Sequence, residues 1–152
     1  MGNCGNKVFT RATFLVGNKM PYTFGFDLTN GIHRGRLRGR VTEEVLREFF
    51  QVAFQQALRT HPSAGVVDLS EVTSFEVPSE TIRQLATATP VLTDPEVQRI
   101  VIAPTPHLFG MMRMFAMEGE RTRPNLHVVH TEKEAWAILG VQSRRFAPLG
   151  TK

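Results

Sequence analysis

The chain has 152 residues, of which 41% are hydrophobic and 21% charged, and Cys4 is its only cysteine. This length suits one domain with a buried core, and the composition excludes a membrane protein and a disulfide-dense scaffold. Eighteen basic residues against fourteen acidic ones give a net charge of +4, a weak preference for acidic partners. No apolar run approaches the ~20 residues that span a bilayer and no signal-peptide core occurs, so we expect a cytoplasmic protein.

Regular patterning begins after residues 1–19, which we expect to form a flexible extension. Apolar and polar side chains then alternate around Asn30-Gly31, the strongest short signal for a hairpin, and Thr42 caps a first helix. Short apolar runs and helical stripes alternate from there on, as in β-α-β units. The predicted strands cover residues 22–28, 32–41, 66–69, 99–103 and 126–129. The predicted helices cover residues 42–59, 79–87, 93–96, 107–118 and 135–139.

This order of elements predicts one α/β domain over residues 20–142, followed by a basic C-terminal tail over residues 143–152. Its mixed sheet would have about five strands, with an N-terminal antiparallel hairpin that leads into parallel β-α-β crossovers. A parallel strand that is covered on both faces reads as a continuous apolar run, which is the pattern of residues 99–103.

Residues 67–72 (VDLSEV) form a strand that ends in an acidic turn, and the chain then leads to a helix start at Ser79. Together with the order of elements, this motif resembles the SpoIIAA-like or STAS-like family of bacterial-type anti-sigma factor antagonists. The resemblance covers most of residues 22–141 and implies a SpoIIAA-like fold. It also implies a non-enzymatic, regulatory protein-interaction module, with a regulatory kinase or an anti-sigma factor-like protein as its partner.

In that family, a hydroxyl at the start of the helix after this turn is phosphorylated, which switches partner binding. The acceptor falls on Ser79 when one residue is inserted, with Val77 and Glu80 in place of the family's Asp and Gly. A phosphate there would meet free backbone N–H groups, whereas the alternative is an ordinary N-cap serine. The candidates for partner binding or the phospho-switch are Ser70, Ser74, Glu76 and Ser79.

Arginine occupies every second position of the return strand, at Arg34, Arg36, Arg38 and Arg40. These side chains would project from one face and could bind the phosphates of a nucleic acid or another anion. No aromatic residue is interleaved, which argues against a platform for single strands. The alternative is a solvated face neutralised by Asp27 or nearby acids, and we therefore expect no nucleic-acid partner.

The predicted helix at residues 107–118 holds more methionine and phenylalanine than one buried stripe can accommodate. Its candidates for an interface are Phe109, Met112 and Met117. Core packing and contact with the N-terminal extension are the alternatives. A homodimer that forms through this helix or through the edge of the hairpin is a further alternative.

A second hypothesis is a small-molecule or lipid-binding module, because open α/β sheets bind ligands beyond the carboxyl ends of their strands. Glu76, Thr105 and His107 are the candidates for such a pocket, and a continuous apolar cavity would favour this function over the first. No nucleophile–base pair, glycine-rich phosphate loop or metal-ligand spacing occurs. We therefore expect no enzyme activity, no cofactor and no metal.

Overall fold

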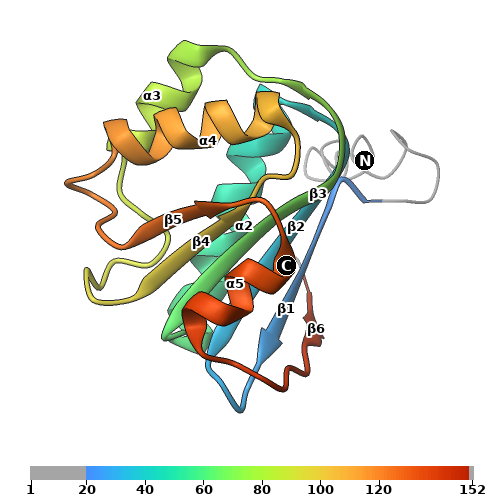
Figure 1. Cartoon of the computed structure of the whole chain (residues 1–152), viewed down its shortest axis with the longest axis vertical. Coiled ribbons are helices and arrows are strands. Elements are labelled where there is room, and N and C mark those ends of the chain that lie inside the picture. Colours follow the sequence, from blue (N-terminus) through green and yellow to red (C-terminus); the bar gives the residue numbers. More distant parts are fainter. Residues whose placement is uncertain (1–19, 151–152) are drawn as a thin grey trace, which may run out of the picture.

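The computed structural model describes residues 20–150, in which four helices pack on a central six-stranded sheet (Figure 1). The strands are β1 (Tyr22–Asp27), β2 (Ile32–Thr42), β3 (Ala64–Glu76), β4 (Gln98–Ile102), β5 (Leu126–Val129) and β6 (Ala147–Leu149). The helices are α2 (Glu43–Thr60), α3 (Ser79–Thr87), α4 (Pro106–Glu118) and α5 (Glu132–Leu139). The predicted α/β class and the hairpin followed by parallel crossovers are confirmed.

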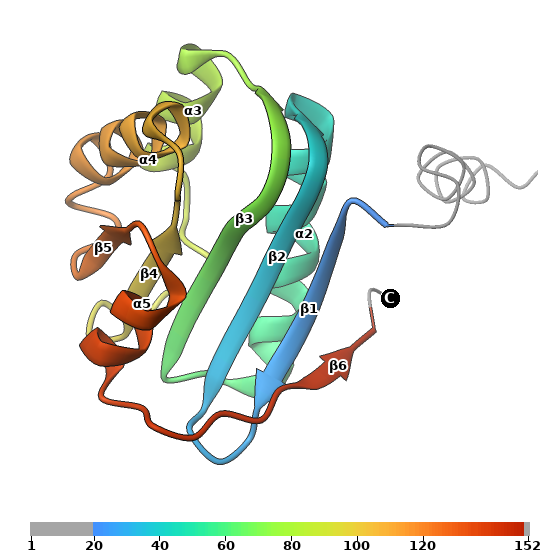
Figure 2. The ribbon, with the colours of Figure 1, turned by 45° about the vertical axis from the view of Figure 1, so that its right-hand side comes forward.

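The sheet is mixed, with the strand order β5-β4-β3-β2-β1-β6. β1 is antiparallel to both β2 and β6, whereas β2, β3, β4 and β5 run parallel to one another. α2 lies behind the sheet in Figure 2 and α5 lies in front of it. Buried side chains of α2, α3 and α4 share one core with the sheet, and those of α5 share another on the opposite face.

Local signals explain where the helices begin and end. The Thr42 hydroxyl accepts a hydrogen bond from the backbone N–H of Val45 and so caps α2. α5 begins with a capping box, in which Thr131 and Glu134 exchange side-chain to backbone hydrogen bonds. α5 ends at Gly140, whose φ of 68° is the left-handed conformation that glycine adopts readily.

β3 is longer than predicted, because the strand continues through residues 70–76 where the sequence suggested a turn. β2 is also long, and its second half pairs with this extension in parallel register, through two irregularities that include Gly39 at φ 70°. Ion pairs from Arg38 to Glu71 and from Arg40 to Glu76 join the two strands here. The acidic residues that suggested a turn therefore serve as cross-strand partners.

Two further segments differ from the prediction. Residues 93–96 form no helix, because the Asp94 carboxylate accepts the backbone N–H of Glu96 in an Asx turn, and the chain then enters β4. Part of the predicted basic tail forms β6, which pairs with β1 and covers that edge of the hairpin. The Asp27 carboxylate fixes this segment by accepting the backbone N–H of Arg145.

Candidate functional site

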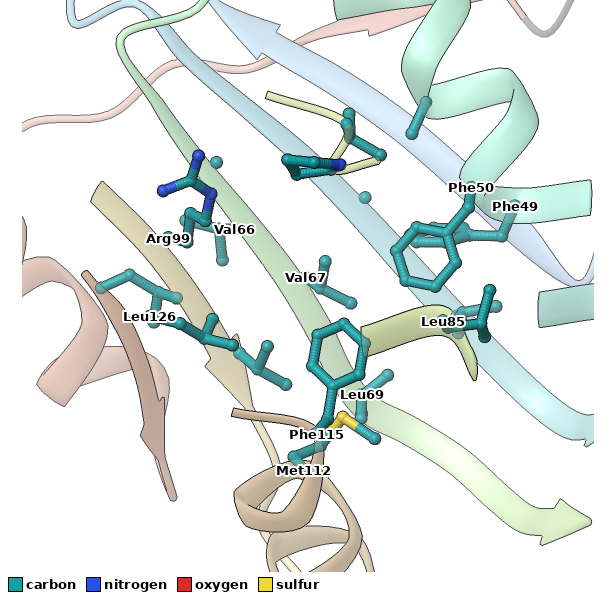
Figure 3. A pocket seen from close by; sticks show the side chains of 18 of the residues that line it. Phe49, Phe50, Val66, Val67, Leu69, Leu85, Arg99, Met112, Phe115 and Leu126 are labelled. Carbon is teal, nitrogen blue, oxygen red and sulfur yellow. The ribbon is translucent and has the colours of Figure 1, made fainter. Parts of the chain in front are cut away.

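The face of the sheet that α2, α3 and α4 cover is incompletely filled above the middle of β3. α2 packs mainly on β1 and β2, whereas α4 packs mainly on α3 and β5, so neither helix covers the middle of β3. Val67 lies at that point and stays partly exposed, although its strand has neighbours on both sides. A cavity of about 100 Å³ remains between the sheet and the helices (Figure 3).

The cavity is almost entirely apolar. Figure 3 shows Phe49 and Phe50 of α2 on one side and Leu126 on the other, with Arg99 at one end and Phe115 and Met112 at the opposite end. The rings of Phe50 and Phe115 stack in parallel with 6.4 Å between their centroids, which joins α2 to α4. Among the lining residues only His33, Arg99 and Arg123 carry a polar side chain.

Arg99 is 7% exposed and holds the loop between α3 and β4 against the end of the cavity. Its Nη2 atom donates to the carbonyl oxygens of Leu92 and Asp94, at 2.6 and 3.0 Å. Its Nη1 atom donates to those of Val97 and Pro124, at 3.2 and 2.8 Å. The guanidinium is thus satisfied by backbone carbonyls rather than by a carboxylate, and it pins the loop to the amino end of β4.

Arg123 lies close enough to Arg99 to be affected by its charge and is equally buried, at 7% exposure. Its Nη1 atom donates to the carbonyl oxygens of Ala86 and Ala88, at 2.7 and 3.4 Å, and its guanidinium carbon lies 4.9 Å from the centre of the Phe115 ring. Burial and then the positive charge of Arg99 lower the pKa of Arg123 to about 10. The two arginines therefore place two positive charges on the wall of an apolar space, Arg99 at one end and Arg123 against the ring of Phe115.

No carboxylate of residues 20–150 forms an ion pair with either of these arginines. All fourteen acidic residues of the chain lie within this described segment, so their side chains are all accounted for. Asp94 favours the charged form of Arg99 through space, but its exposed carboxylate does not contact the guanidinium. No carboxylate in contact therefore balances the charges of Arg99 and Arg123.

His33 lies on the cavity wall contributed by β2 and is 5% exposed. Its Nε2 atom is 2.8 Å from Oε1 of Gln56, whose Nε2 atom donates to the carbonyl oxygen of Gly150. Because Gln56 uses its amide N–H on Gly150, its oxygen accepts and His33 Nε2 donates. Burial lowers the pKa of His33, and the hydrogen bond to Gln56 only partly opposes this effect.

We expect the free energy of unfolding to decrease as the pH falls below about 6.5, the ordinary pKa of histidine. Below this pH His33 becomes protonated in the unfolded chain but stays neutral in the folded protein. Stability is therefore lost until the pH reaches the lower pKa of His33 in the folded state. His33→Gln should flatten this dependence in urea titrations between pH 5 and 7.5, and His107→Gln, at an exposed position, should not. An unchanged slope in His33→Gln would contradict this role.

The arginines of β2 face the α5 side of the sheet, and most have acidic partners. The shortest ion-pair distances are 3.2 Å from Arg36 to Asp68, 3.3 Å from Arg38 to Glu71 and 2.9 Å from Arg40 to Glu76. Arg34 instead lies over the ring of Phe146, at 3.9 Å from its centre. The partners come from β3 in parallel register, and the carboxylate of Asp27, an expected partner, binds Asn30 and the backbone of Arg145 instead.

The residues proposed for the phospho-switch are spread along the end of β3 and the start of α3. Ser70 and Ser79 are exposed, whereas the Ser74 hydroxyl donates to Glu76, which also binds Arg40. Ser79 is the first residue of α3, and the capping position is Pro78, without a side-chain capping bond. The Ser79 hydroxyl therefore does not act as the N-cap.

The residues proposed for a pocket at the carboxyl ends of the strands do not line the cavity. Glu76 binds Arg40 and Ser74 instead. The Thr105 hydroxyl accepts the backbone N–H of Leu108 and so caps α4, and His107 is exposed. The polar end of the cavity lies instead near the amino ends of β3 and β4, at Arg99.

The three interface candidates of α4 have different surroundings. Met112 is buried and lines the cavity, so it contributes no exposed surface. Phe109 is half-buried and stacks on the ring of His130 with 4.0 Å between the centroids. Met117 is 68% exposed and is the only one of the three that is freely accessible.

A scan against protein-family models finds no match for this chain, and no curated protein matches it either. The resemblance to the SpoIIAA-like family therefore stays a prediction. In the segment that the structure describes, no helix combines the length and the apolar character needed to cross a membrane. Residues 20–150 also contain no cluster of three or more His, Cys, Asp or Glu side chains that could hold a metal ion.

Proposed function

We propose that this domain binds a small, largely apolar molecule in the cavity between β3, α2 and α4. The observation that carries the proposal is the cavity itself, which lies over the central strand and has only three polar side chains in its lining. Empty apolar space destabilises a core by about 24 cal/mol per Å³, or roughly 2 kcal/mol here. A bound molecule would recover this energy.

The size of the cavity limits the ligand. A dry cavity of about 150 Å³ holds a benzene molecule, so about 100 Å³ suits a ring or chain of similar size or slightly smaller. Phe50, Leu85 and Leu126 line the cavity and are only partly buried, which offers a route of entry and room for a somewhat larger group. A long lipid chain would not fit without displacing side chains.

A regulatory protein-interaction module remains the second candidate. It is favoured by the exposure of Ser79 on α3 and Met117 on α4, two helices that pack against each other. Both residues could belong to one docking surface, and a phosphate on Ser79 would change its charge. This function does not require the cavity, so the two candidates can be separated.

The test is native mass spectrometry of the protein purified at low salt from the cells that make it, with and without phosphatase. We expect the intact chain to carry one small organic molecule, irrespective of phosphatase treatment. A co-purifying protein whose binding changes on removal of a phosphoryl group would favour the second candidate. A bare chain that also gains no thermal stability from hexanol or toluene would contradict the proposed function.

A further inference from the structure

We propose that the ligand of this cavity carries a carboxylate, which Arg123 binds and Arg99 stabilises through its charge; this inference rests on the proposed function. Two arginine residues that are each only 7% exposed, and whose charges affect each other, are unusual without an acidic partner in contact. Removing a charge from water is unfavourable unless it is paired and hydrogen-bonded. The carbonyl oxygens around Arg99 and Arg123 provide hydrogen bonds but no opposite charge.

The chain itself does not supply the missing anion from a side chain. Every Asp and Glu lies within residues 20–150, and none contacts these two arginines within 4.0 Å. Residues 1–19 contain no acidic residue, so that segment adds no carboxylate side chain. A negative group from a ligand would therefore meet two positive charges with no acidic side chain in contact with either, although Asp94 acts on Arg99 through space.

The hydrogen bonds identify which arginine has donors to spare. Both terminal nitrogens of Arg99 already donate to carbonyl oxygens. Arg123 uses only Nη1, and its Nε and Nη2 atoms have no partner among the described residues. Neither atom is among the unpartnered polar atoms that are completely sealed from solvent, which are Nε of Arg38 and Nε1 of Trp136. Arg123 lines the cavity, and its Nε and Nη2 atoms are free of partners among the described residues, so they can donate to a ligand.

Nε and Nη2 of one guanidinium form the two-pronged donor pair that matches the two oxygens of a carboxylate. A carboxylate also brings a single negative charge, which apolar walls tolerate better than the higher charge of a phosphate. The rest of the ligand must fit about 100 Å³ of apolar space. The class is therefore a small monocarboxylic acid with a short aliphatic chain or a single aromatic ring.

The experiment measures dissociation constants by calorimetry at pH 7.4 for two matched pairs, hexanoate with hexanamide and benzoate with benzamide. Each pair has nearly the same shape and differs in charge. We expect the better-fitting acid to bind at least about tenfold more tightly than its amide, because a hydrogen bond to a charged partner is much stronger than a neutral one. Arg123→Gln should abolish this preference and leave the affinity for the amide almost unchanged.

Arg121→Gln is the matched control, since this exposed arginine lies two residues away, carries the same charge and does not line the cavity. It should keep the preference for the acid. If amides bind as tightly as acids to the wild-type protein, the carboxylate inference is wrong and the proposed function survives. If neither acids nor amides bind, both are wrong. The comparison of acid and amide on the wild-type protein holds even if Arg123→Gln fails to fold.

Discussion

The substitution Val67→Phe is expected to weaken ligand binding strongly while the domain remains folded. Val67 lies at the middle of β3, lines the cavity and is only partly buried, so a larger side chain can grow into empty space. Part of the roughly 2 kcal/mol associated with the cavity should be recovered, offset by imperfect packing of the ring. We therefore expect the free energy of unfolding to change by less than about 1 kcal/mol and the affinity for hexanamide or hexanoate to fall at least about tenfold.

Val141→Phe is the control for this variant. Val141 is also partly buried, but it packs against the core on the α5 side of the sheet. Its replacement should leave binding unchanged in the same calorimetric titration. Unaltered affinity in Val67→Phe, with the fold intact, would show that ligands do not occupy the space above β3.

The substitution Arg99→Met is expected to destabilise the domain by about 3 kcal/mol or more. Methionine fills a similar volume but removes the donors that serve four backbone carbonyls between Leu92 and Pro124. A buried carbonyl without a partner costs about 1–3 kcal/mol, and water can rescue only the more exposed of them. The loop between α3 and β4 should detach first, since Arg99 is its main anchor.

Urea denaturation followed by the fluorescence of Trp136 measures this effect, because Trp136 is the only tryptophan and is buried on the opposite face. Arg121→Met, at an exposed position, should change the free energy of unfolding by less than about 0.5 kcal/mol. A loss below about 1 kcal/mol in Arg99→Met would mean that the loop does not depend on these hydrogen bonds.

The fold was largely predictable from the sequence because most of its elements have local signals. Asn30-Gly31 sets the hairpin, and capping residues such as Thr42 and Thr131 start helices close to the predicted positions. The extension of β3 was not predictable, since it depends on pairing with the far end of β2 through irregular register. β6 likewise exists through contacts with a strand more than a hundred residues earlier.

The cavity could not be predicted, because it arises from the spacing of α2 and α4 rather than from any run of residues. Local sequence also does not distinguish a buried arginine from an exposed one, and Arg123 stands in a loop beside the exposed Arg121. One signal was present: Arg99 begins the apolar run of β4, where a charged residue on a covered strand is unexpected. The prediction placed the pocket at the carboxyl ends of the strands, whereas the charged end of the cavity lies near their amino ends.

The most direct measurement of the central claim is a methyl NMR titration of the protein with hexanoate. If hexanoate binds in the cavity, four methyl-bearing residues that line the cavity from four different elements should show saturable shift changes. These residues are Val67, Leu85, Met112 and Leu126. The signals of Val129 and Leu139, in the core on the α5 side, should stay unchanged. Shifts that concentrate on the α5 side, or no saturable shifts with hexanoate, benzoate and their amides, would contradict the account.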